Sequence, residues 1–392
     1  MTNTLMISLD TTIFTGKIGN TRARHEGYAQ LANGHLSMVV LNRAAGYTPL
    51  ETPRLSVHPT ESRGLPLLRY WRDGVRTGLV LQAAHPAAVI SSQDPFLSAL
   101  IALRLKHRTG KPLIIQDHSA IFSSPYFVRE HPRNYLARTL GVLMIRQADA
   151  VRVVSRRERL ACIRYGIRPS AICVIPVATE TAAFAADPDP DAVAAWRVRL
   201  GITEKNPTIL WVGRPVAFKN LSLLLTAFQR IVTELPEARL ILAGDMNGTN
   251  YIGQAAARGL GDAVKFPGTV PYGDLPALFH AADVYALSSN YEGFGRVLVE
   301  AGAAGLPVVA TDTAGAADVV ADGLTGAIVP IGNAEKLAEA LLLLLRHPVR
   351  RKQFATRARQ HVQANFEEGT LTRKWVEMWH RLSRGLPPCA LS

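Results

Sequence analysis

Cysteine is scarce in this chain of 392 residues, and its scarcity excludes two kinds of protein. The three cysteines, Cys162, Cys173 and Cys389, follow no metal-binding or redox spacing. They also do not form the cysteine pattern of a small disulfide-stabilised secreted domain. We therefore expect no disulfide framework and a reducing compartment.

Long apolar segments are absent as well. The longest uncharged run that we find, residues 77–93, contains Gln82, His85 and Pro86. A membrane-spanning helix needs about 20 mostly apolar residues, so none is expected. The chain reaches Asp10 without the basic region and apolar core of a signal peptide. We expect a cytoplasmic, globular protein, because 48% of the residues are hydrophobic and the length suffices for two domains with separate cores.

Acidic residues are few in the first half of the chain. Residues 1–186 hold 23 Lys and Arg against 11 Asp and Glu, and so carry an excess of 12 of the net charge of +13. An anionic partner, such as a membrane surface, a lipid diphosphate or an acidic glycan, would explain this asymmetry. A generally basic proteome is the alternative. Nucleic acid is not expected as a partner, because no reader motif is present.

Residues 288–330 are the most informative stretch of the chain. A polar loop ends in YEGFG (291–295), and helix-forming residues then run from Arg296 to Ala304. A short buried strand is expected at 307–311. A glycine-containing loop that opens a helix leaves unpaired N–H groups at the positive end of the helix dipole, which makes an anion site.

Two carboxylates frame this loop and helix. Glu292 precedes the helix, and Glu300 falls about one and a half turns inside it. If the helix runs away from a bound phosphate, the inner carboxylate can accept hydrogen bonds from ribose hydroxyls. The alternative is a solvated helix face. However, Glu300 lies in the apolar run RVLVEAGAAG, and a buried carboxylate needs partners.

The first half of the chain alternates between strands and helices, which indicates a doubly wound sheet. We predict strands at 5–9, 36–41, 88–93 and 112–116, and helices at 21–32 and 96–107. The first loop carries Gly16 and Gly19, and His118 follows the strand at 112–116. Ligands of such folds bind at the carboxyl ends of the strands, so His118 is a candidate ligand-binding residue rather than a surface histidine.

The second half begins after the acidic, proline-rich segment 187–191, which we interpret as the domain boundary. A buried strand at 208–212 leads through a turn into a helix at 221–235. The turn contains Arg214 and Lys219, and two cations at a strand end can clamp a diphosphate and stabilise it as a leaving group. A pair of exposed basic residues is the alternative.

Three segments in this order resemble the retaining, nucleotide-sugar-dependent glycosyltransferases of group 1 (family 4 type). They are ADAVRVVS, VGRPVAFKNLSLLLTAF and EGFGRVLVEAGAAGLPVVAT, the last with the Glu292-x7-Glu300 pattern. The resemblance implies an α/β fold with the GT-B architecture, in which two doubly wound, Rossmann-like domains face each other across a cleft. Residues 1–186 would form the acceptor-side domain and residues 187–369 the nucleotide-sugar-binding domain. The terminal helix, 370–392, would pack back on the first domain.

The resemblance also implies roles for individual residues. Glu300 would hold the ribose, Arg214 and Lys219 the diphosphate, and Glu292 and His118 the donor sugar. The remaining donor contacts would come from Gly213, from the amides of Phe294 and Gly295, from the backbone at Thr269 and Val270 beside the base, and from Gly16. No metal and no cofactor are implied, because cations and a helix end already neutralise the phosphates of a UDP-sugar or GDP-sugar donor.

The implied reaction is transfer of a sugar to a hydroxyl of a glycan or lipid-diphosphate-linked glycan, with retention of configuration. Together with the basic first half, this predicts surface polysaccharide biosynthesis by a cytoplasmic enzyme that touches the inner membrane face peripherally. Two alternatives remain. The chain could be an inactive nucleotide-binding or accessory homologue, or a nucleotide-sugar epimerase of the same fold; a phosphorylase is disfavoured by the short chain.

Overall fold

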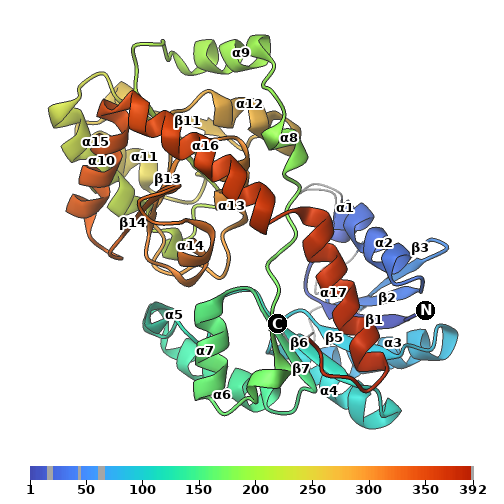
Figure 1. Ribbon diagram of the computed structural model, residues 1–392. Coiled ribbons are helices and arrows are strands. Elements are labelled where there is room, and N and C mark those ends of the chain that lie inside the picture. The colour runs from blue at the N-terminus through green and yellow to red at the C-terminus, as the bar shows by residue number, and fades with distance from the viewer. Residues whose placement is uncertain (16–20, 43–45, 61–66, 390–392) are drawn as a thin grey trace. The chain divides into compact units, whose positions relative to one another are not determined.

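The computed structural model describes residues 1–15, 21–42, 46–60 and 67–389 (Figure 1). The chain divides into two compact units, Met1–Pro176 together with Gly369–Ser392, and Val177–Glu368. Each unit is built around one mainly parallel sheet. The predicted pair of doubly wound α/β folds is therefore confirmed.

The sheet of the first unit has eight strands in the order β3-β4-β2-β1-β5-β6-β7-β8. All neighbouring pairs are parallel except β3 and β4. Its strands are β1 (Thr4–Ser8), β2 (Leu36–Val40), β3 (Leu50–Glu51), β4 (Leu55–Pro59), β5 (Val89–Ser92), β6 (Leu113–Asp117), β7 (Ala150–Val153) and β8 (Ile172–Val174). The central strands are buried along their length, which explains their apolar sequences.

Helices of the first unit connect these strands and cover the sheet. They are α1 (Thr12–Thr15), α2 (Thr21–Leu31), α3 (Leu67–Ala84), α4 (Leu97–Thr109), α5 (Pro125–Glu130), α6 (Pro132–Ile145) and α7 (Arg156–Arg164). The last helix of the chain, α17 (Glu368–Ser383), joins them. It buries Trp375 and Trp379 among the apolar side chains of β1, β2 and β4, so this aromatic pair belongs to the core.

A disulfide joins Cys173 in β8 to Cys389 beyond α17, with Cα atoms 5.8 Å apart. Our expectation of a chain without a disulfide is therefore wrong. The two cysteines are 216 residues apart in sequence, and only the return of α17 to the first unit brings them together. Cys162 is buried and free.

The sheet of the second unit has six parallel strands in the order β11-β10-β9-β12-β13-β14. They are β9 (Thr208–Val212), β10 (Arg239–Ala243), β11 (Val264–Gly268), β12 (Val284–Leu287), β13 (Val308–Thr311) and β14 (Gly326–Val329). Chain order runs outward in opposite directions from β9 and β12. The carboxyl ends of these two strands are thus the topological switch point, where open α/β sheets bind their ligands.

Nine α-helices of the second unit lie within the described ranges. They are α8 (Ala182–Ala185), α9 (Pro190–Leu200), α10 (Leu221–Glu234), α11 (Tyr251–Ala257), α12 (Leu275–His280), α13 (Arg296–Ala303), α14 (Ala314–Val319), α15 (Ala334–Arg346) and α16 (Pro348–Asn365). The core lies between the sheet and helices α10 and α15, most of whose leucines are buried together.

The boundary between the units falls between Pro176 and Val177, ten residues before the predicted one at 186/187. Phe184 is fully buried in the second unit, with its ring 5.3 Å from that of Phe279. The acidic, proline-rich segment instead begins α9, where Asp189 caps the helix by accepting a hydrogen bond from the amide of Asp191.

No helix within the described ranges is both long enough and apolar enough to cross a bilayer.

Candidate active site

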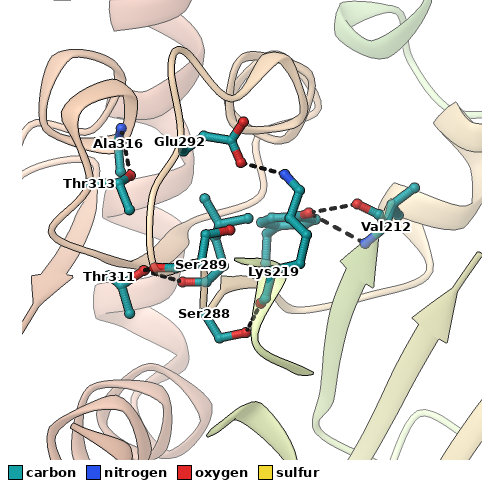
Figure 2. Close-up of polar contacts among 10 residues, drawn as sticks. Val212, Lys219, Ser288, Ser289, Glu292, Thr311, Thr313 and Ala316 are labelled. Atoms are coloured by element: carbon teal, nitrogen blue, oxygen red, sulfur yellow. Dashed lines mark hydrogen bonds and ion pairs between the residues drawn. The ribbon is translucent and has the colours of Figure 1, made fainter. Parts of the chain in front are cut away.

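Two segments that follow β9 and β12 lie side by side at the switch point of the second unit (Figure 2). The amide of Asn290 donates to the carbonyl of Phe218 at 2.7 Å, and the side chain of Asn220 donates to that of Asn290 at 2.9 Å. The rings of Phe218 and Tyr291 stack with centroids 4.6 Å apart. The turn after β9 and the loop after β12 are therefore held as one structure.

Lys219 and Glu292 form an ion pair within this structure, through the Nζ atom of the lysine and Oε2 of the glutamate (Figure 2). Both side chains are only 15% exposed. Ser288 donates from its hydroxyl to the backbone carbonyl of Lys219 at 2.9 Å, which fixes the turn below the lysine. Two residues predicted independently from the sequence thus meet, and each orients the other.

Arg214 lies on the same turn and is exposed. Its side chain has no hydrogen bond or ion pair with any residue that the structure describes, so its charge is available to an anion. The preceding Gly213 continues the sheet edge by donating from its amide to the carbonyl of Ala243 at 3.0 Å.

The loop after β12 ends at the N-terminus of α13. Gly295, which precedes the helix, has φ +78°, a backbone conformation that favours glycine. Gly315 donates to the carbonyl of Glu292 at 3.0 Å, and a side chain at Gly315 would overlap the backbone of Phe294. The amides of Phe294 and Gly295 have no acceptor among the described residues, and they lie at the positive end of α13. The Phe294 side chain is buried against Phe366, so only its backbone is available to a ligand.

Glu300 lies inside α13 with a side chain 8% exposed. The Tyr272 hydroxyl donates to its Oε1 atom at 3.4 Å, and a guanidinium nitrogen of Arg296 lies 3.9 Å from the same oxygen. Burial raises the pKa of Glu300, although Arg296 and the Tyr272 hydroxyl counteract this. Both contacts are long, so the carboxylate has capacity to accept hydrogen bonds from ligand hydroxyls.

Thr269 and Val270 follow β11, two strands from β9 in the same sheet. Thr269 is exposed, and Val270 is half-buried. The amide of Gly244, after β10, donates to the carbonyl of Gly268 at 2.9 Å. The carboxyl ends of β9, β10 and β11 therefore present a continuous edge of backbone.

His118 belongs to the first unit, at the carboxyl end of β6, as the strand prediction required. It is half-buried, and its pKa is lowered to about 3 by burial and by the nearby charges of Arg152 and Arg24. The imidazole is therefore neutral near pH 7 and can exchange hydrogen bonds with a hydroxyl group. Gly16, the other predicted site residue of this unit, lies outside the described residues.

A buried polar network fixes the loop 119–124 that follows His118. Asp117 accepts from the amide of Ser119 at 2.9 Å, and Glu158 in α7 accepts from the amides of Phe122 and Ser123 at 2.6 and 3.0 Å. Asp117 and Glu158 are fully buried. These contacts hold the loop in one conformation, directly beside a predicted site residue.

The loop 119–124 also contains a strained residue and is bound by a third polar side chain, that of Arg138. Ala120 is buried and has φ +54°, which is uncommon for a residue with a side chain. Arg138 in α6 donates from Nε to the carbonyl of Ile121 at 2.8 Å and from its guanidinium to the carbonyl of Ser124. Strain of this kind persists only where the surroundings over-determine the backbone.

The sequence analysis missed Asp117 and Glu158. The available signal was the pattern Ser155-x-x-Glu158, which is typical of a helix N-terminus with a capping box. Ser155 does accept from the amide of Glu158 at 3.2 Å, but the glutamate side chain turns to the loop 119–124 instead.

Replacing Asp117 with asparagine should remove a pH dependence of stability. Burial and the neighbouring Glu158 raise the pKa of Asp117 well above its ordinary value. The native state then holds a proton that the unfolded chain releases, so the free energy of unfolding falls as pH rises from about 4 toward the raised pKa. Urea unfolding at a series of pH values should show this decline in the wild type and a weaker one in the variant. Asp262→Asn, at an exposed residue, is the control, and an unchanged decline in Asp117→Asn would contradict the assignment.

Within the described ranges, no three His, Cys, Asp or Glu side chains gather closely enough to hold a metal ion.

Comparison with known protein families identifies both halves of the chain. Residues 193–361 match the family "Glycosyl transferases group 1", and residues 19–178 match "Glycosyl transferase 4-like domain". A D-inositol 3-phosphate glycosyltransferase of Corynebacterium aurimucosum is 30% identical over 68% of this chain and 66% of its own length. A GDP-mannose-dependent monoacylated alpha-(1-6)-phosphatidylinositol monomannoside mannosyltransferase of Corynebacterium glutamicum is 31% identical over 50% of each chain. The matched region thus spans about half to two thirds of these relatives.

Solved structures share the fold along nearly the whole chain. Sucrose-phosphate synthase from Thermosynechococcus elongatus matches with a TM-score of 0.84 at 23% identity, over 98% of this chain and all of the other. Anabaena HepE, in complex with UDP and glucose, matches with a TM-score of 0.76 at 22% identity, over 97% of this chain and all of the other. At these identities the likeness supports the architecture, not the substrates.

Proposed function

The chain belongs to the group 1 glycosyltransferases, and from this premise we propose that it transfers a sugar from a UDP-sugar or GDP-sugar to a hydroxyl group with retained configuration. The observation that carries the proposal is the convergence at one switch point of an unpaired arginine, an ordered Lys219–Glu292 pair and the free amides that open α13. These groups suit a diphosphate, and Glu300 lies further along the same helix.

The diphosphate would be bound by Arg214, by Lys219 and by the amides of Phe294 and Gly295. Negative charge grows on the β-phosphate as its bond to the sugar breaks. Donors that are already oriented stabilise this charge without reorganisation. Because Lys219 is held by Glu292, its ammonium group is in place before the donor arrives.

Glu300 would accept hydrogen bonds from the ribose hydroxyls, since its present contacts are long and its position is buried. The backbone at Thr269 and Val270 would hold the base. Recognition by backbone groups at an exposed sheet edge suits either uracil or guanine.

Glu292 would bind the donor sugar. We also propose His118, in the first unit, as a ligand for sugar hydroxyls, on the ground that its imidazole is neutral near pH 7. In the front-face mechanism, the bond from the anomeric carbon to the phosphate oxygen breaks. A bond from the same carbon to the acceptor oxygen forms on the same face, and the acceptor proton passes to the departing phosphate. This mechanism uses no protein acid–base pair and no metal, because cationic side chains and the α13 terminus compensate the phosphate charge.

We further propose a lipid-linked or other anionic glycan acceptor, and a cytoplasmic enzyme that works at the inner membrane face in surface polysaccharide biosynthesis. Two observations support this proposal. The first 186 residues carry almost the whole positive excess of the chain. Relatives are named for acceptors that contain inositol phosphate or phosphatidylinositol.

A donor screen tests the proposed reaction. Purified protein is incubated with UDP-sugars and GDP-sugars, with and without acceptors and with and without EDTA, while free nucleotide and new sugar linkage are both measured. We expect nucleotide release that depends on an acceptor, equals the sugar linked and persists in EDTA. Turnover without acceptor would instead favour an epimerase or hydrolase, and no turnover with retained nucleotide binding would favour an inactive homologue. A strict requirement for Mg²⁺ or Mn²⁺ would contradict the metal-independent mechanism.

A further inference from the structure

Helix α6 of the first unit carries apolar side chains on its outer face as well as on its inner face. Its inner face buries Gly141, Val142, Met144 and Ile145. On the opposite side, Leu136, Leu140 and Leu143 are 61%, 46% and 47% exposed. Spacings of four and three residues place these leucines in one stripe along the helix. Tyr135 beside them is 69% exposed.

Scattered exposed leucines are ordinary, but a stripe of three on one short helix is not. The surface helices of a globular protein normally turn a polar face outward. We therefore expect this side of α6 to bind a partner. We call it the α6 face and define it as Arg133, Tyr135, Leu136, Leu140, Leu143 and Arg146.

Charge around the α6 face is mainly positive, although the neighbouring helix α5 exposes Glu130 beside Arg129. Helix α6 contains no acidic residue, and the exposed Arg133 and Arg146 lie near its two ends. Helix α4, which packs beside α6, also lacks acidic residues and exposes Arg104 and Arg108. The other arginine of α6, Arg138, turns inward to the loop 119–124 and does not contribute to the surface.

We propose that the α6 face docks on an anionic lipid bilayer. The leucine stripe would enter the boundary between headgroups and acyl chains, Tyr135 would sit at the headgroup level, and the arginines would meet lipid phosphates. With 14 residues, α6 measures about 21 Å, so it lies in the interface and does not cross the membrane.

An apolar stripe bordered mainly by cations is less suited to a second copy of this basic chain. Pairing two such faces would bring arginines of like charge together. The same leucine stripe and cations match a lipid bilayer, which has an apolar interior and anionic headgroups at its surface. This inference rests on the proposed function, because a membrane-linked acceptor would explain why the enzyme binds a bilayer. Vesicle binding is measured without donor or sugar transfer, so the membrane docking and the proposed reaction can fail separately.

The test is co-sedimentation of the full chain with vesicles of phosphatidylcholine alone and of phosphatidylcholine with phosphatidylglycerol. The informative variant is Leu136→Gln/Leu140→Gln/Leu143→Gln, in which each exposed leucine becomes a polar helix-forming residue. The matched control is Leu324→Gln/Leu343→Gln, at exposed leucines of the second unit. Thermal unfolding of each variant verifies that it is folded.

We expect the wild type and the control to bind the anionic vesicles, and the triple variant to bind at least about tenfold more weakly, since each buried methylene contributes about 0.8 kcal/mol. Arg133→Gln/Arg146→Gln should weaken binding and reduce its salt dependence, because salt screens charges beyond about 8 Å at 0.15 M. Equal binding by wild type and folded triple variant, equal recovery with neutral and anionic vesicles, or no binding to either would overturn the proposal. A wild-type dimer in sedimentation velocity that the triple variant makes monomeric would also overturn it, in favour of a second copy.

Discussion

Replacing Arg214 with alanine is expected to lower kcat for sugar transfer by about 10²–10³-fold, equivalent to about 3–4 kcal/mol of transition-state stabilisation. Arg214 is exposed at the switch point and has no side-chain partner among the described residues. Its removal therefore costs the fold little, but it withdraws a cation from the place where charge develops on the leaving phosphate. The loss should appear mainly in kcat, because the interaction strengthens as the sugar departs.

Two further variants sharpen this test. Arg214→Lys keeps the charge but loses the planar guanidinium with its paired donors, so it should restore activity only partly. Arg357→Ala removes an exposed arginine of α16, away from the switch point, and should keep wild-type kinetics. If Arg214→Ala stays within threefold of the wild type while nucleotide sugar is still turned over, Arg214 does not stabilise the leaving group.

Glu300→Gln is expected to raise the dissociation constant for the nucleotide by about 10–100-fold, because hydrogen bonds to a charged group contribute about 1.5–3 kcal/mol. The same change should leave the melting temperature unchanged or raise it. Burial raises the pKa of Glu300, which means that the folded state disfavours its ionised form. An uncharged side chain of the same shape removes that cost near pH 7.

Calorimetric titration with UDP and GDP, paired with thermal unfolding, separates a binding role from a structural one. Glu335→Gln, at an exposed glutamate in the first turn of α15, is the control and should change neither quantity. Wild-type nucleotide affinity in folded Glu300→Gln would contradict the assignment of the ribose contact. Loss of affinity together with a large drop in melting temperature would make Glu300 a structural residue.

The positions of the proposed donor-site residues at the strand ends could be predicted because these residues lie in short segments with local signals. Lys219 and Glu292 each stand beside a strand end, and parallel strands bring their carboxyl ends to one edge of the sheet. The sequence did not predict their ion pair, because it depends on β9 and β12 being neighbours. Local patterns identify the edge of a sheet on which residues lie, and strand order decides which of them meet.

Contacts between segments that are far apart in the sequence could not be predicted. The Cys173–Cys389 disulfide depends on where α17 ends, and no spacing rule relates residues 216 positions apart. The contacts of Glu158 depend on the approach of α7 to the loop after β6. The unit boundary was displaced because an acidic, proline-rich segment suits a helix N-terminus as well as a linker.

The measurement that tests the central claim most directly is proton NMR of the protein with a UDP-sugar or GDP-sugar of α configuration and an acceptor. The spectra follow the anomeric proton of the donor and that of the product from the first turnover. We predict loss of the donor signal, an equal gain of an α-linked product and release of the nucleotide diphosphate, with EDTA present throughout. A β-linked product would contradict retention, and a donor consumed only to free sugar or to its epimer would contradict glycosyl transfer itself.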